Sequence, residues 1–316
     1  MTVLPWQPGQ TPYVTPDQLY STAGSGGVSQ WPVGVQWGTI MGQPNVPYAQ
    51  LFSVLASICG EGTVRAEEIA NQPLRATISA EELQGPDFRV TYQEHTGNGR
   101  IIASRWPVLS VSSVEVAPNA VWPRSWTSLP AGTFEPEYPV QSLYGTTVGS
   151  GAGGAGQAIL FAPGYMNRCL GRQGWRVRVT YLAGWPHTCL TAAALAGDGT
   201  LTVDDCTGWT GAAGIIYDAL GGGQETFSCT ATSVTAGPGT LTLAANIAYA
   251  HGAGIMTSAM PQTGIWATAQ LAGATALTRG ATATTIQTTG GRRQSSTPDL
   301  LDDLAKKRLR ALMRTI

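Results

Sequence analysis

The side chains best suited to acid–base or nucleophilic chemistry lie far apart in this sequence. The histidines are His95, His187 and His251, and none has a neighbouring nucleophile or carboxylate in a pattern that indicates a catalytic triad. A triad needs a base within hydrogen-bond reach of both a nucleophile and an orienting group. Without such a constellation we interpret the histidines as polar turn residues, and we predict no enzymatic activity.

The cysteines show no metal-binding spacing. The chain has five of them, and no two form a C-x-x-C pair. Structural zinc sites combine such pairs with nearby histidines. We therefore predict reduced thiols that act as small core residues. The five are Cys59, Cys169, Cys189, Cys206 and Cys229.

Acidic residues between 188 and 260, where the chain has no Lys or Arg, raise the question of a calcium site. Calcium needs several convergent oxygens, and the D-x-D-x-D-G loop is absent. We predict instead that these residues form turns and aid solubility, and we predict no metal. They are Asp198, Asp204, Asp205, Asp218 and Glu225.

The glycine-rich stretch at 145–156 contains Gly149, Gly151 and Gly154 in the order of a dinucleotide-binding fingerprint. That fingerprint lies between a strand and a helix. Here a strand-like run at 158–161 follows the glycines, so we predict a loop and no cofactor.

Composition narrows the class of protein. The 316 residues are 43% hydrophobic and 12% charged, with a net charge of −1. These values are not typical of a disordered chain or of a globally basic nucleic-acid-binding protein. No apolar run approaches the length of about 18 residues that a transmembrane helix needs. The first residues also lack the basic and apolar regions of a secretory signal.

Apolar spacing predicts the elements. Leu51, Val54, Leu55 and Ile58 recur as on one helix face, which predicts a helix over 47–59 that ends at Gly60. Further short or medium helices are predicted over 16–20, 64–71 and 263–279. Residues 1–46 are otherwise predicted to form an extended arm. Alternating patterns predict strands over 74–78, 88–92, 101–104, 108–116, 158–161 and 175–182.

Residues 188–260 form a compositional island. The segment 197–209 resembles the segment 237–249, and Pro186 and Pro261 bracket the island. Short β-runs with Gly turns predict an inserted all-β module that resembles a barrel or a sandwich.

The last 25 residues carry the clearest local signal. Thr297 is a predicted N-cap and Pro298 the first helical residue. The amphipathic helix that follows has an apolar stripe that nothing downstream need cover, and we predict that it docks on a partner protein. Truncation after Gly291 is then expected to leave a folded protein. The predicted docking residues are Leu301, Leu304, Leu309, Leu312, Lys306, Lys307, Arg308, Arg310 and Arg314.

Two short motifs carry a family resemblance. The run Trp106-Pro107-Val108-Leu109-Ser110-Val111 is similar to a strand element of bacteriophage head-to-tail adaptor proteins, also called head-completion or connector proteins. The run from Tyr181 to Pro186 resembles their later Tyr-x-x-Gly element, which passes through Pro into a helix. In this chain the corresponding helix is displaced to about 263–279, beyond the β island.

The resemblance implies a structural virion protein without catalysis. Such adaptors form a ring, typically of twelve copies, under the portal. They extend the channel for genomic DNA and hold the next connector or tail protein, and they reach the virion from the host cytoplasm. The C-terminal segment commonly docks on the portal. The alternatives are another tail or connector protein, or a cell-surface or carbohydrate-binding β module, for which exposed Trp is the indicator.

The predicted fold is α+β, with a small helical core, a β-hairpin or sheet region and the inserted all-β module. The predicted domains are an arm (1–46), an adaptor core (47–186 with 261–291), the inserted β domain (187–260) and the docking helix (292–316).

Overall fold

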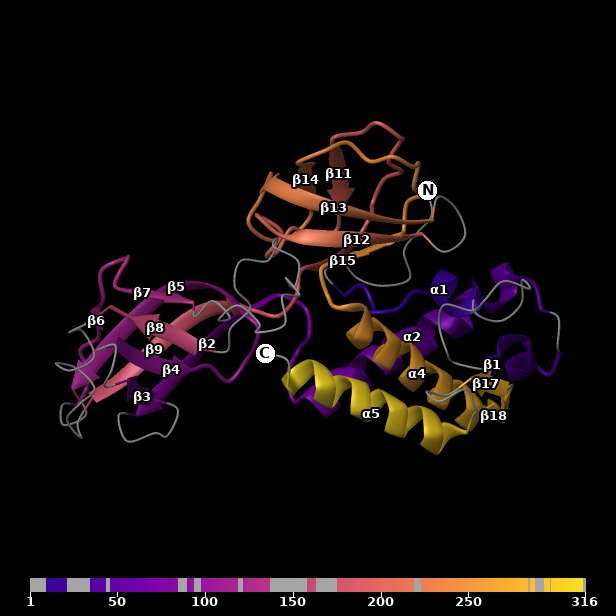
Figure 1. The fold of residues 1–316 in the computed structure, drawn as a ribbon, viewed down its shortest axis with the longest axis horizontal. Helices are drawn as coiled ribbons and strands as arrows, with labels where there is room; N and C mark the ends of the chain where they lie inside the picture. The colour runs from indigo at the N-terminus through magenta and orange to yellow at the C-terminus, as the bar shows by residue number, and fades with distance from the viewer. Residues whose placement is uncertain are drawn as a thin grey trace. The chain divides into compact units, whose positions relative to one another are not determined.

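The computed structural model describes most of the chain and is α+β, with helices and several antiparallel sheets (Figure 1). The described residues are 10–21, 35–43, 46–84, 90–93, 98–118, 122–136, 158–162, 175–218, 223–283, 285–287, 293–295 and 297–314. The predictions for His95, Cys169 and the 145–156 loop lie outside them. No helix in the described part is long and apolar enough to cross a membrane.

The chain forms two compact units that divide it differently from the predicted domains. Residues 75–185 form one unit, and residues 1–74 with 186–315 form the other. The predicted adaptor core is therefore split near Leu74 and Pro186. The β module belongs to the same unit as α4 (Gln262–Thr278), which follows it in sequence, and not to the unit that contains β9 (Trp175–Ala183), which precedes it.

Among the described residues of the larger unit there are four α-helices and a short 3-10 helix. Of these, α2, α4 and α5 pack together. The helices are α1 (Pro16–Ser21), η1 (Trp37–Met41), α2 (Tyr48–Ala70), α4 (Gln262–Thr278) and α5 (Pro298–Arg314).

Helix α2 is one continuous helix, so the predicted break at Gly60 is wrong. It passes through Gly60 and Gly62 and ends at Asn71, which has the left-handed φ of 53°. A Cβ on Gly62 would lie 3.0 Å from the carbonyl oxygen of Thr268 on α4. Glycine here serves a close approach of two helices, and tertiary packing carries the helix past its local stop signal.

Helix α4 is buried on nearly all sides. Twelve of its residues are buried, including Gly264 and every position from Ala267 to Ala276. We expected one apolar face, but α2 and α5 pack around α4. Its small Ala, Gly and Thr side chains allow this close packing.

In its described residues, the unit of residues 75–185 contains two four-stranded sheets with the orders β2-β9-β5-β6 and β3-β4-β8-β7. They share one core, to which Val114 and Val179 contribute from the first sheet and Ile101 and Ile159 from the second. The strands are β2 (Thr77–Gln84), β3 (Val90–Gln93), β4 (Asn98–Ile102), β5 (Val108–Pro118), β6 (Thr127–Ser128), β7 (Phe134–Pro136), β8 (Ala158–Phe161) and β9 (Trp175–Ala183).

The predicted β island is a curled, half-barrel sheet of six strands in the order β10-β15-β12-β13-β14-β11. Its two edges meet, because the N–H of Thr191 donates to the oxygen of Thr202 (2.9 Å) and that of Asp204 to the oxygen of Cys189 (3.1 Å). The strands are β10 (His187–Cys189), β11 (Thr200–Val203), β12 (Ala213–Asp218), β13 (Gly223–Thr232), β14 (Gly239–Leu243) and β15 (Met256–Ser258).

The two copies of the sequence repeat pair with each other in this module. Strand β11 comes from the first copy and β14 from the second, and Leu201 lies opposite Leu241. Both leucines are fully buried, whereas Thr200 is exposed. The repeat therefore contributes one apolar face to the core, as alternation along a strand requires.

The N-terminal segment is not an exposed arm where the structure describes it. Tyr13, Val14 and Leu19 are fully buried. The N-cap of α1 is formed as predicted, since Thr15 Oγ1 accepts from the N–H of Gln18 at 3.5 Å. The short strands β1 (Val35–Gln36), β16 (Thr282–Ala283), β17 (Thr285–Gln287) and β18 (Arg293–Ser295) complete the unit as the pairs β1-β16 and β17-β18.

Candidate functional site

The apolar stripe predicted on the C-terminal helix is buried within the chain itself. Leu301 and Leu309 are fully buried, and Leu312 is 5% exposed. Helix α5 packs on α4 and contacts α2. Helices α4 and α2 therefore cover this stripe, which we had expected a partner to cover. Leu304 lies at its flank and is only half-buried.

A polar contact fixes α5 on the other two helices. Arg65 of α2 bonds Asp302 of α5, and its other terminal nitrogen donates to Thr275 Oγ1 of α4 at 3.2 Å. Asp302 also lies 3.7 Å from the ammonium of Lys306, one turn along α5. Because the Arg65 and Asp302 side chains are 34% and 23% exposed, the pair adds orientation more than stability.

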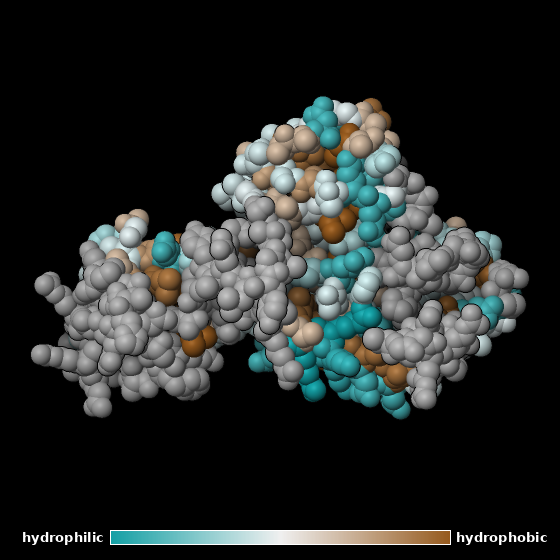
Figure 2. Space-filling model, in the orientation of Figure 1, coloured by the Kyte–Doolittle hydropathy of each residue, from teal (hydrophilic) through white to brown (hydrophobic). Residues whose placement is uncertain are grey.

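The predicted basic docking residues divide into two groups. Lys307 and Arg310 are exposed, so their charges face solvent. The guanidinium of Arg308 instead stacks on the ring of Trp266 at 4.8 Å. Arg314 is the last residue of α5. The surface over α5 is largely hydrophilic (Figure 2).

His187 is a buried structural residue and not the polar turn residue that we predicted. Its Nε2 lies 3.0 Å from the carbonyl oxygen of Pro12, which can only accept, so Nε2 carries the proton. Its Nδ1, 3.0 Å from Ser258 Oγ, then accepts from that hydroxyl. This pairs a hydroxyl with an imidazole, but both residues are at most 5% exposed.

His251 is buried between two carboxylates. Its Nδ1 lies 3.2 Å from Asp218 Oδ2 and its Nε2 lies 3.2 Å from Glu225 Oε2. Burial raises the pKa of Glu225, but N–H donors from Ala248, His251 and Tyr249 outweigh it and lower that pKa overall. Both ring nitrogens therefore face a carboxylate oxygen, which can accept a hydrogen bond.

The acidic residues of the module are held by internal hydrogen bonds. Asp204, which is 2% exposed, accepts from the hydroxyls of Thr11 and Thr188 and from the N–H of Cys189. Asp205 accepts from the N–H of Gly237 at 3.1 Å. No group of His, Cys, Asp and Glu in the described ranges could hold a metal ion. The four described cysteines are buried.

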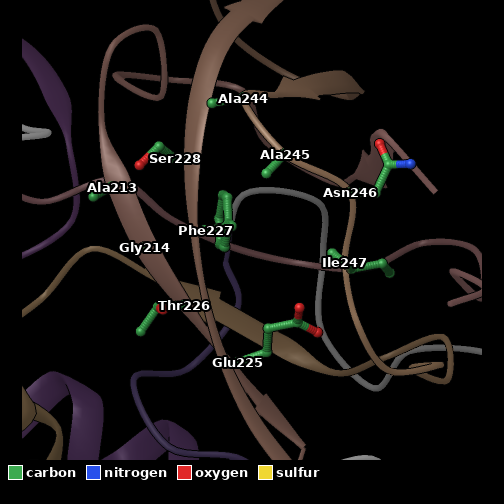
Figure 3. Close-up of a pocket in the computed structure, with 10 residues that line it drawn as sticks. All are labelled: Ala213, Gly214, Glu225, Thr226, Phe227, Ser228, Ala244, Ala245, Asn246 and Ile247. Atoms are coloured by element: carbon green, nitrogen blue, oxygen red, sulfur yellow. The ribbon is translucent and has the colours of Figure 1, made fainter. Parts of the chain in front are cut away.

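A pocket of about 340 Å³ opens beside β13, where β14 has ended (Figure 3). Phe227 and Glu225 project from one side of the strand, toward Ala245 and Ile247. The Glu225 carboxylate accepts from the backbone N–H groups of Ala248 and Tyr249 and lies 3.2 Å from His251 Nε2, so it is held in place. The remaining lining is small or weakly polar: Ala213, Gly214, Thr226, Ser228, Ala244 and Asn246.

The β module does not expose a tryptophan, which was the expected indicator of carbohydrate binding. Its single tryptophan, Trp209, is fully buried and stacks on Phe227 at 5.4 Å. Gly214 permits the stack, because a Cβ there would lie 2.6 Å from the Trp209 ring.

Sequence reasoning missed the residues that join distant segments. Tyr13, Arg65 and Asp204 make their contacts across 50 residues or more. The only local signal was residue type, since charged and aromatic side chains placed among buried positions need partners.

Comparison of the chain with family models, with curated proteins and with solved structures found no match.

Proposed function

We propose that the chain is a structural virion protein, a head-to-tail adaptor that forms a ring, typically of twelve copies, under the portal. In this role it extends the channel for genomic DNA and joins the capsid to the next connector or tail protein. It acts without catalysis, and it reaches the head–tail interface of the virion from the host cytoplasm.

One observation carries the proposal: the two motifs that resemble the adaptor family lie side by side. Val111 of the first motif is opposite Tyr181 of the second on the paired strands β5 and β9. The N–H of Gly184 donates to the oxygen of Pro107 at 2.9 Å. Motifs about 70 residues apart in the sequence thus form one structural feature, which favours a shared origin over chance similarity.

The proposal also assigns a place in the adaptor to each part of the fold. In an adaptor of this kind, α2, α4 and α5 form the small helical core, and the unit of residues 75–185 forms the sheet region. The curled β module, inserted between β9 and α4, is an addition to that plan.

The portal contact proposed here uses the exposed side of α5. Lys307 and Arg310 point to solvent while the leucines hold the helix on α4. Exposed cations attract acidic groups of a partner or phosphates in the channel. We favour acidic portal groups, because docking at one fixed position needs a partner with defined geometry.

Imaging of capsids that lack tails tests this function. We expect density for the protein as a closed ring at one vertex. Density spread over the capsid shell or along a tail tube would rule out the adaptor role.

A further inference from the structure

The N-terminal segment of residues 11–19 is buried against helix α2 and the β module. Its polar contacts are with Thr63 and Glu67 of α2 and with His187 and Asp204 of the module, and the surface made by these four residues is called the groove below. Within the segment, Thr11, Tyr13, Val14 and Leu19 are at most 1% exposed. The segment therefore joins the helices to the module.

Tyr13 makes the largest share of these contacts. Its N–H donates to Thr63 Oγ1 at 3.0 Å, and its hydroxyl donates to Glu67. The same hydroxyl accepts from the N–H of Leu74 at 3.1 Å. Its ring meets the His187 ring edge-on, with centroids 5.0 Å apart.

The residues before Tyr13 supply partners for buried polar groups of the module. Thr11 Oγ1 donates to Asp204 at 2.8 Å, and the oxygen of Pro12 accepts from His187 Nε2 at 3.0 Å. Asp204 and His187 are 2% and 5% exposed. Without the segment, Asp204 and His187 would each lose a hydrogen-bond partner at a buried position, which costs folding free energy. The folded protein therefore requires a filled groove.

The connection between α1 and β1 is long enough for the groove to be filled by residues 11–19 of the same chain or of a neighbouring copy. Thirteen residues, 22–34, separate α1 from β1, and four of them are glycine and two serine. A chain of that length reaches up to about 45 Å when extended. A ring places different faces of neighbouring copies together, and exchange of identical segments adds contact area at little cost.

We propose that the groove binds residues 11–19 of a neighbouring copy, so that adjacent subunits of the assembled ring exchange this segment. The inference rests on the proposed ring. The groove gives the exchange its specificity, because Thr11 and Tyr13 must meet Asp204 and Glu67 at fixed spacing.

The first experiment tests recognition between separate chains. A full-length Tyr13→Ala variant has a weakened segment of its own and an intact groove. A synthetic peptide of residues 10–21 should raise its melting temperature in a saturable way. A peptide with Tyr13→Phe should bind about ten- to a hundredfold more weakly, because it loses a hydrogen bond to a charged group. A peptide with Gln10→Ala is the matched control and should bind equally, since Gln10 is exposed.

The second experiment distinguishes exchange from self-docking and needs no destabilised variant. A photoreactive side chain at position 10 of the otherwise unchanged chain is activated in assembled heads and in dilute protein. We expect covalent dimers from heads and intrachain adducts from dilute protein.

The outcomes separate this inference from the proposed function. A ring at the vertex with intrachain adducts alone overturns the exchange and leaves the adaptor role intact. Absence of any ring in heads contradicts the adaptor role and, because the exchange is between subunits of that ring, overturns the exchange as well. Failure of the peptide to bind the Tyr13→Ala variant overturns the groove as a site for a second copy.

Discussion

Gly184 donates its N–H to the carbonyl oxygen of Pro107, and this bond joins the two sequence motifs at the end of the β5–β9 pair. Gly184 has a φ of 105°, and a Cβ there would lie 2.2 Å from the carbonyl oxygen of Arg75. The motif thus requires glycine both for its backbone conformation and for the close approach of the backbone at Arg75.

Replacing Gly184 with alanine should strongly destabilise the unit of residues 75–185. We expect Gly184→Ala to lower its free energy of unfolding by about 2–5 kcal/mol, from left-handed strain together with overpacking. Gly132→Ala is the control, because Gly132 has a φ of 86° with open space around it. It should cost about 1 kcal/mol. Equal losses in urea unfolding of the two variants would show that the close approach to Arg75 does not matter.

Substitution of Leu309 should lower the free energy of unfolding, whereas substitution of the exposed cations of α5 should not. Leu309→Ser should lower the free energy of unfolding by about 2–5 kcal/mol, because a fully buried side chain is removed from the helix packing. For the same reason, truncation after Gly291 should no longer leave a stable protein.

Charge reversal tests the outer side of the same helix. The double variant Lys307→Glu with Arg310→Glu should keep its stability within about 0.5 kcal/mol, as exposed substitutions usually do. It should nevertheless join heads poorly, as measured by occupancy on purified capsids. Asp303→Lys, also exposed on α5, is the control and should join normally. Normal occupancy of the double variant would exclude the basic side of α5 as the portal contact.

Glu225 should make the stability of the β module depend on pH. Its pKa in the folded protein is lowered from the usual 4.5 by donors that outweigh burial. A carboxyl of this kind stabilises the fold above its unfolded pKa, and that contribution is lost as the pH falls through the folded pKa. The melting temperatures of the wild type and Glu225→Gln should therefore differ near neutral pH and converge in acid. A constant difference across that range would contradict this assignment.

Removing the imidazole between the two carboxylates should be more severe. His251→Leu leaves Asp218 and Glu225 without the donor they share, and we expect a loss of about 3–5 kcal/mol in the free energy of unfolding. Adding Asp218→Asn to that variant should recover part of the loss, because it removes one of the two charges. Absence of any recovery in thermal unfolding would indicate that packing, and not charge, sets the cost.

Gln270 offers a stabilising substitution. It is fully buried in α4, and neither polar atom of its amide has a hydrogen-bond partner in the described structure. Gln270→Met removes this uncompensated burial and should raise the free energy of unfolding by about 1–3 kcal/mol. Gln262→Met, at the partly exposed start of the same helix, should change it little. A loss of stability in Gln270→Met would reveal that the amide is bonded in solution.

The elements set by short-range signals were predictable. Thr297 caps α5 as expected, since its Oγ1 accepts from the N–H of Leu300 at 3.2 Å. Thr15 caps α1, and alternation located β5 and β9 to within two residues. The β island between the two prolines forms one curled sheet. Caps, alternation and turns depend on neighbours a few residues away, so the sequence displays them directly.

The partners of those elements were decided only in three dimensions. The sequence shows that Leu301, Leu309 and Leu312 form an apolar stripe, but not that α4 and α2 cover it. It predicts a stop at Gly60, whereas the helix continues, and the approach of α4 makes Gly62 a packing residue within one long helix. The sequence determined which surfaces must be buried, because apolar area is a property of local residue types. Which surface buries which was set by the packing of segments far apart in the chain.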